Sequence, residues 1–333
     1  MRKSLLVCSF LPAIAAVAFG QMPPIGAIDF YGVRTVPIER LRAALAVNVG
    51  DALTGQVRTA VKQLETIPRV ERTAVDAVCC EGGKSTLYIG IQETGTPPLE
   101  FRPAPTSQLE LPPEVLVGFA EYETAFNQAV QAGDFAEDDS AGYSLMHFPA
   151  ARAAQEAFVG LASRYNAELV SVLRESANDE HRAIAAQVLA YSSDKSATVE
   201  QLVFATRDPH PTVRNNAVRA LALLAGFARR NPQSNLAVPA APLVDLLNSL
   251  VWTDRNKASL ALMQISENGD RALLSLLKER ALASLVEMAR WKAPGHAMAP
   301  LLILGRIGGM TDEATFHAFA QDKRDVIIQA ATR

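Results

Sequence analysis

A pattern of three residues recurs through the second half of the chain and constrains its fold. Arginine is followed by alanine three positions later and by leucine seven positions later. The copies are Arg182/Ala185/Leu189, Arg214/Ala217/Leu221 and Arg255/Ala258/Leu262, and a looser fourth is His296/Ala299/Ile303. Their first residues are 32, 41 and 41 positions apart, a period typical of helix pairs that stack into a solenoid. The pattern predicts an all-α stack that binds along a surface.

An apolar run precedes each copy and provides the other helix of each pair. Leu169 to Leu173 and Leu243 to Leu250 are two such runs. Alanine and leucine at positions three and seven share one helix face, where the small residue allows close approach of the partner helix. We expect a helical domain over residues 114–333, with the clearest repeats at 166–310.

The clearest copy reads Asp208-Pro209-His210-Pro211-Thr212-Val213-Arg214-Asn215-Asn216-Ala217. It resembles HEAT repeats of the short bacterial type, in which an aspartate opens the second helix and an arginine follows. Because an arginine can pair with the carboxylate of its own or the next repeat, we expect a structural ladder. Its members are Asp179, Arg182, Asp208, Arg214, Asp254 and Arg255.

The same resemblance implies where a partner would bind. In solenoids of this family the second helix of each pair lines the concave side. Four polar residues lie off the apolar face of these helices: Asn215, Arg219, Asn256 and Lys257. They are the candidates for contact with a protein or peptide partner.

The first twenty residues have the order of a secretory signal peptide. Arg2 and Lys3 precede an apolar run from Leu5 to Phe19, and Gly20 closes the segment. The run is shorter than the ~20 residues that cross a bilayer comfortably. We expect a signal peptide at 1–20, cleavage near Gly20 and a periplasmic or secreted protein without an integral membrane segment. A retained anchor is the alternative.

Charge argues against a nucleic-acid partner. The formal net charge is -3, and removal of Arg2 and Lys3 with the signal segment makes it -5. Nucleic-acid binders usually carry a basic patch or domain. We expect a protein or peptide as the partner, and not nucleic acid or a small molecule.

Residues 21–94 predict a small α+β domain with the order β-α-α-β-β. Leu41, Leu45 and Val49 follow Pro37 at helical spacing, and a second apolar face runs from Val57 to Ile67. After the glycine pair at 82–83, alternation predicts a half-buried strand. Its inward residues are Leu87, Ile89 and Ile91, and its outward residues are Tyr88, Gly90 and Gln92.

Several landmarks of this segment resemble the polypeptide-transport-associated (POTRA) domain. They are Ile28-Asp29-Phe30-Tyr31-Gly32, Val36-Pro37, Val49-Gly50-Asp51, Ile67-Pro68-Arg69-Val70 and Gln92-Glu93. The resemblance implies a domain outside the inner membrane that docks a polypeptide segment, often on a strand edge. The family usually precedes an outer-membrane barrel or follows a membrane anchor, and this chain shows neither pattern.

Two adjacent cysteines, Cys79 and Cys80, follow the signal segment. In an oxidising compartment they can form a vicinal disulfide or pair with another chain. Alternatively, they lie on a strand and point to opposite faces, which is the interpretation that we favour.

A proline-rich linker is expected at residues 95–113, which contain six prolines. The acidic stretch from Asp134 to Asp139 lies between two predicted helices. It lacks the glycine and ligand order of a calcium loop and is interpreted as a solvated turn. Residues 312–331 predict one terminal capping helix.

The sequence contains no recognisable catalytic, cofactor-binding or metal-binding motif. Its five histidines form no pair at ligand spacing, and no serine stands in a nucleophile-elbow sequence. These observations favour an exported, non-enzymatic adaptor that binds proteins. The alternatives are an accessory factor of outer-membrane protein assembly or secretion, and an enzyme similar to the chromophore lyases that share short bacterial HEAT repeats.

The signal-peptide interpretation predicts the mass of the exported protein. Intact-mass spectrometry of the chain from the exported fraction is expected to show loss of about 20 residues, as cleavage near Gly20 requires. Retention of Met1 in that fraction contradicts the prediction.

Overall fold

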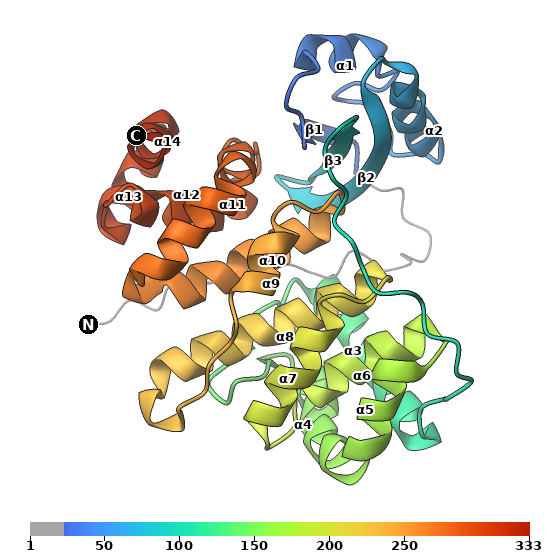
Figure 1. The fold of residues 1–333 in the computed structure, drawn as a ribbon. Helices are drawn as coiled ribbons and strands as arrows, with labels where there is room; N and C mark the ends of the chain where they lie inside the picture. Colours follow the sequence, from blue (N-terminus) through green and yellow to red (C-terminus); the bar gives the residue numbers. More distant parts are fainter. Residues whose placement is uncertain (1–22) are drawn as a thin grey trace. The chain divides into compact units, whose positions relative to one another are not determined.

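A computed structural model describes residues 23–333, so the predicted signal segment lies outside the described residues. The chain forms two compact units (Figure 1). The helical unit is Phe101–Pro242. The sheet unit combines the described residues up to Glu100 with Leu243–Arg333. Residues 23–100 therefore fold together with the last repeats.

The small sheet has the predicted β-α-α-β-β order. Its elements are β1 (Ile25–Tyr31), α1 (Ile38–Ala44), α2 (Gln56–Gln63) with the short η1 (Leu64–Thr66), β2 (Val70–Glu81) and β3 (Lys84–Glu93). The strands are ordered β1-β3-β2, with β1 parallel and β2 antiparallel to β3. Gly82 and Gly83 both have positive φ, which allows the tight turn between β2 and β3.

One face of the sheet packs against α1 and α2. Its core includes Phe30, Leu41, Val61, Leu87 and Ile89. The first helix ends earlier than its apolar spacing predicts: α1 stops at Ala44, and the Val49 side chain is 58% exposed. Leu41 and Leu45 are buried as expected, but the helix does not continue to Val49.

The prediction that the last strand is half-buried is wrong. Every residue of β3 after Lys84 is buried. Tyr88, on the face away from α1 and α2, stacks on Trp252 with ring centroids 4.8 Å apart, and its hydroxyl lies 2.6 Å from His296 Nδ1. Trp291 contacts the same ring from 4.9 Å. Aromatic side chains from the last repeats thus cover the second face of the sheet.

The helical unit is built from paired helices. They are α3 (Pro113–Ala132), α4 (Pro149–Arg164), α5 (Asn166–Glu175), α6 (Asp179–Leu189), α7 (Lys195–Ala205) and α8 (Pro211–Arg230). Two short strands, β4 (Glu137–Asp138) and β5 (Leu145–Met146), pair between α3 and α4. Ala185, Leu189, Ala217 and Leu221 of the repeated pattern are buried, which confirms the predicted helix faces.

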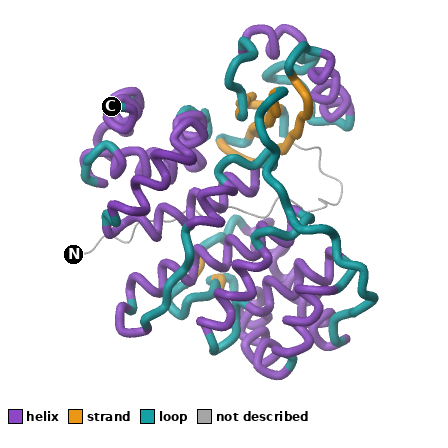
Figure 2. Tube along the Cα trace, in the orientation of Figure 1, coloured by secondary structure: helices purple, strands orange, loops and turns teal. Residues whose placement is uncertain are grey.

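The sheet unit contains the later helices. They are α9 (Ala241–Leu246), α10 (Trp252–Ile265), α11 (Arg271–Ala289), α12 (Pro294–Ile307), α13 (Asp312–Ala320) and α14 (Arg324–Thr332). The first two residues of α9 still belong to the helical unit. A short turn, η2 (Pro232–Ser234), follows α8, and another, η3 (Ser266–Asn268), follows α10. The predicted single capping helix is two helices, because Asp322 has a left-handed φ of 56° between α13 and α14. Figure 2 shows that helices predominate among the described residues.

The proline-rich segment is packed over much of its length and is not a free spacer. Residues 101–113 belong to the helical unit, since the boundary between units falls after Glu100. Leu111 is buried, Ser107 pairs with Ser176 in an isolated bridge, and the Phe101 ring lies 3.7 Å from the Arg214 guanidinium carbon. No described helix is long and apolar enough to cross a membrane.

The buried histidine predicts how the stability of the sheet unit depends on pH. Desolvation, with a smaller contribution from nearby Lys257, lowers the pKa of His296 to about 4. The unfolded chain therefore binds this proton more readily than the folded protein does. Stability is unaffected by His296 above about pH 6.5 and falls as the pH drops toward 4, by about 3 kcal/mol.

Chemical denaturation of the wild type and His296→Asn between pH 4 and 7 measures this effect. Asp29 and Asp76 act in the opposite direction, because burial raises the pKa of both carboxyls. They are common to both proteins, so the difference in unfolding free energy isolates His296. A difference that is constant over this pH range contradicts the prediction.

Candidate binding site

A buried ion pair positions the second helices of the helical unit. Arg182 on α6 donates from Nε and Nη2 to the two carboxylate oxygens of Asp208, at 2.9 and 3.0 Å. The side chains are 2% and 0% exposed. Asp208 stands in the turn before α8 and also accepts from the His210 N–H at 2.8 Å. The pair therefore connects α6 to the start of α8.

The other expected ladder residues have different partners. Asp179 is the first residue of α6, and its carboxylate lies 2.9 Å from His210 Nε2; Asn178 caps the helix. Arg214 donates to the backbone oxygens of Asp208 and Pro209, at 2.8 and 3.0 Å. Both contacts hold the turn that leads into α8.

A pocket opens in the helical unit among α3, α6, α8 and the β4–β5 segment. Its apolar wall comes from four aromatic residues with Met146 and Leu223: Tyr122, Phe126, Phe135 and Tyr191. Gln187, Asn215, Asn216, Arg219, Glu137 and Ser144 provide its polar lining. Two of the four expected contact residues, Asn215 and Arg219, thus lie in one pocket.

Arg219 and Glu137 form an ion pair in this pocket. Arg219 Nη2 donates to both Glu137 carboxylate oxygens, at 2.5 and 2.7 Å. The attraction of Glu137 raises the pKa of Arg219, which keeps the guanidinium charged. Glu137 is only 12% exposed, and the prediction of a solvated acidic turn is wrong for this residue.

The tyrosines of the pocket are held protonated at neutral pH. Burial raises the pKa of Tyr122 to about 12 and that of Tyr191 above its ordinary value. The Tyr191 hydroxyl donates to the Ser144 backbone oxygen at 2.8 Å. Neutral phenols and a closed ion pair suit binding better than proton transfer.

Two buried polar atoms in the pocket have no hydrogen-bond partner among the described residues. They are Asn215 Oδ1 and Ser144 Oγ, on side chains that are 6% and 2% exposed. An unsatisfied buried polar group costs about 1–3 kcal/mol, so each is a position where a ligand can supply the missing bond.

The other two expected contact residues lie inside the sheet unit. Asn256 and Lys257 on α10 are 2% and 3% exposed, and Lys257 lies close enough to His296 to affect its pKa. These residues are not available on a surface, because the N-terminal sheet packs on the helices that follow α9.

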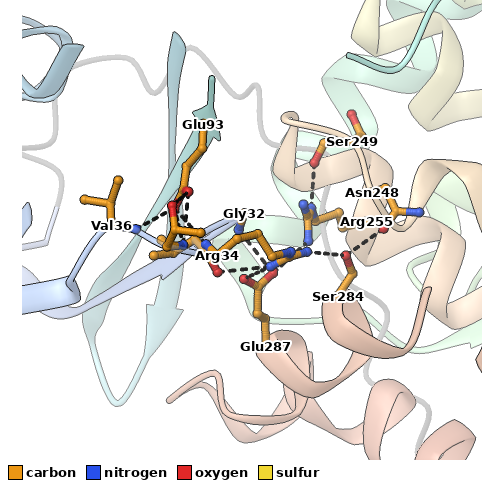
Figure 3. A network of polar contacts seen from close by, with 11 residues as sticks. Gly32, Arg34, Val36, Glu93, Asn248, Ser249, Arg255, Ser284 and Glu287 are labelled. Atoms are coloured by element: carbon orange, nitrogen blue, oxygen red, sulfur yellow. Dashed lines mark hydrogen bonds and ion pairs between the residues drawn. The ribbon is translucent and has the colours of Figure 1, made fainter. Parts of the chain in front are cut away.

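A polar network replaces the ladder in the sheet unit (Figure 3). Glu287 on α11 accepts from Arg255 Nη1 at 3.3 Å and from the Gly32 N–H at 3.1 Å, and it also pairs with Arg34. Arg255 Nε donates to Ser249 O at 2.5 Å. Asp254 accepts from the Ser249 hydroxyl at 2.6 Å. Glu287 thereby joins the last repeats to the sheet.

Glu93 anchors the chain beside this network. Its carboxylate accepts from the N–H groups of Arg34, Thr35 and Val36, at 2.8, 2.9 and 3.0 Å. Burial alone would raise the pKa of Glu93, but these bonds and that of the Thr35 hydroxyl lower it to about 2. The loop after β1 is therefore held rigidly against β3.

The cysteines are placed on β2. Cys79 is half-buried and disulfide-bonded. The side chain of Cys80 lies outside those described, so the expectation about the pair stays a prediction. Among the side chains that the structure describes, no group of three or more His, Cys, Asp or Glu is arranged to hold a metal ion.

Sequence reasoning missed Ser144, Tyr122 and Tyr191 as pocket residues. None belongs to the repeated pattern, and they come from elements that precede or end a repeat. The signal for Glu137 was present, since it stands in the acidic segment, but its partner Arg219 lies 82 residues away.

The comparisons with known proteins agree with the repeated helix pairs. Residues 166–263, from the start of α5 into α10, match the family described as HEAT repeats. None of the curated proteins gives a significant match. The resemblance to HEAT repeats is therefore confirmed for this part of the chain.

Solved structures of designed repeat proteins are distantly similar. One is "Designed armadillo repeat protein YIII(Dq.V1)4CPAF in complex with peptide (KR)4", with 17% identity, a TM-score of 0.38 and coverage of 55% of this chain and 92% of that one. Another, of computationally designed armadillo repeat proteins for modular peptide recognition, has 18% identity, a TM-score of 0.38 and the same coverage. Likeness this distant carries no information about function.

The Arg182–Asp208 pair predicts a large effect of removing one charge. Asp208→Asn leaves the buried guanidinium uncompensated, and we expect it to lower the unfolding free energy by about 3 kcal/mol. Urea denaturation measures the change. The matched control is Asp245→Asn, whose partner Arg280 is 42% exposed, and it is expected to cost less than about 1 kcal/mol. Equal effects of the two substitutions contradict the prediction.

Proposed function

We propose that this protein is an exported, non-enzymatic scaffold that binds a peptide segment of a partner protein in the pocket of the helical unit. One observation carries the proposal: Asn215 Oδ1 and Ser144 Oγ are buried in that pocket without hydrogen-bond partners among the described residues. Asn215 and Arg219 lie on the second helix of a repeat, where HEAT-like solenoids present their contact surface. The signal-like segment at 1–20 supports export.

The character of the pocket supports binding over catalysis. Its ionisable groups are the Glu137–Arg219 pair and two tyrosines. Arg219 and the two tyrosines keep their protons at neutral pH, because Glu137 raises the pKa of Arg219 and burial raises both phenol pKa values. A lyase-like enzyme needs a group that gives or accepts a proton, and this lining offers a poor one.

The small sheet supports a second docking position, which the POTRA resemblance implies. The Thr73 N–H donates to Glu65 Oε1 at 2.9 Å and so points away from β3. By strand alternation, the N–H groups of Val75 and Ala77 point the same way. Within the described residues β2 pairs only with β3, which leaves this edge for an extended segment. This edge is also the feature that favours the alternative role in outer-membrane assembly or secretion.

Selection from a random peptide library against the full exported chain tests the proposal. We expect enriched peptides to bind the wild type and to lose at least tenfold in affinity on Asn215→Leu, which keeps side-chain volume and removes the amide. Asn248→Leu, an asparagine outside the pocket, is the matched control and is expected to leave the affinity unchanged. Circular dichroism checks that each variant is folded.

A further variant separates the two docking positions. Ala77→Pro removes one N–H from the outer edge of β2. If Ala77→Pro loses binding and Asn215→Leu keeps it, the peptide binds at the strand edge. Failure to enrich any peptide contradicts the scaffold function itself.

A further inference from the structure

A second, larger hollow lies between α3 and α4, and we call it the α3–α4 groove. On α3, Tyr122 and Phe126 line the small pocket beside α6 and α8. Another side of α3, with one side of α4, encloses a volume of about 680 Å³. Most of its lining is apolar: Val117, Ala120, Ala125, Ala150, Ala153, Ala154 and Ala157. The α3–α4 groove is therefore large enough to receive several side chains of a partner.

The apolar lining of the α3–α4 groove is accessible. The Val117 side chain is 58% exposed, and Ala120, Ala150, Ala153 and Ala157 are exposed as well. These helices form the first pair of the helical unit. The outer face of a terminal pair in a solenoid is normally polar, because no further repeat stacks on it. An open apolar surface at this position is typical of a site that another protein covers.

The spacing of the lining residues fits a helix as the occupant. On α3 they stand at 117, 120, 121, 124, 125 and 128, and on α4 at 150, 153, 154 and 157. Steps of three and four residues keep each set on one side of its helix. Small side chains along two neighbouring helices allow a third helix to lie close, and its large apolar side chains fill the space that the alanines leave.

Charge indicates which kind of helix binds. Helix α3 contains three glutamates and no basic residue, and α4 contains one glutamate and two arginines, so the pair carries a net charge of -2. Glu121 itself lines the α3–α4 groove. A second copy of the chain, docked by the same face, would place these excess acids against each other, which is unfavourable. A helix that carries lysine or arginine is attracted instead.

We propose that the α3–α4 groove binds an amphipathic, basic α-helix of a partner protein. Leucine-sized side chains on one stripe of that helix enter between α3 and α4, and a lysine or arginine beside the stripe pairs with Glu121. This surface shares no exposed lining residue with the small pocket, so the proposal does not depend on peptide binding there.

Three labelled peptides test the proposal on the full chain. Each is acetylated, amidated and about 18 residues long, which is sufficient for helix formation in an alanine-rich sequence. The first has leucines along one stripe with lysines beside it. The second has glutamate in place of lysine. The third has the composition of the first, with the leucines spread around the helix. Fluorescence anisotropy gives the dissociation constants.

We expect the first peptide to bind at least about tenfold more tightly than either of the others, because it alone matches both shape and charge. Ala153→Arg places a long cation in the α3–α4 groove and is expected to weaken this binding by at least about tenfold. The matched control is Ala167→Arg, an exposed alanine of α5 outside the lining, which is expected to leave the affinity unchanged.

A charge reversal tests the role of Glu121. On Glu121→Lys the lead of the lysine peptide over the glutamate peptide is expected to fall, since the new cation attracts the glutamates. Glu168→Lys, an exposed acid of α5, is the control and is expected to keep that lead. Circular dichroism checks that every variant is folded.

Several results overturn the proposal. They are absence of binding by the first peptide, equal binding of the first and third peptides, and unchanged binding on Ala153→Arg. Sedimentation velocity adds another: a wild-type dimer that Ala153→Arg dissociates assigns the α3–α4 groove to a second copy. The proposed function fails separately, through the library peptides and Asn215→Leu, and none of the substitutions used here lies in the small pocket.

Discussion

The bidentate Arg182–Asp208 pair is the interaction on which the site of the helical unit depends. The free energy needed to remove two charges from water exceeds what one contact between them contributes. Such a pair is therefore stable only with aligned geometry and further hydrogen bonds. The structure provides both, because Arg182 also donates to the Ser176 backbone oxygen at 2.8 Å. The pair sets α8 against α6, where Asn216 Nδ2 donates to the Ala183 backbone oxygen and Asn216 Oδ1 accepts from Asn215 Nδ2.

The later repeats use equivalent helices in another way. The fourth copy lacks the aspartate and arginine of the pattern, and Arg255 of the third copy forms an ion pair with Glu287 of α11. Tyr31 and Tyr88 of the sheet pack with Trp252 and Trp291, and all four side chains are at most 2% exposed. The surface of α10 and α12 is therefore filled by the chain itself, while α8 contributes to a pocket.

How far prediction succeeded depended on whether the controlling contacts were local. The buried alanine and leucine faces of α6 and α8 follow from spacing within one helix, and so does the β-α-α-β-β order of the small sheet. Val49 continued the spacing of α1, yet the chain turns before it. Glu137 was expected in solvent because its partner, Arg219, stands on the fifth helix after it.

The sequence by itself determined the repeat period, the helix faces and the polar positions of the second helices. Only the tertiary structure decided which of these positions line a pocket. Asn215 and Asn256 follow equivalent arginines and are indistinguishable by pattern, yet one lines a pocket and the other lies buried in the sheet unit. The reason is that periodicity specifies which side of a helix is polar, whereas the element that covers that side comes from a distant part of the chain.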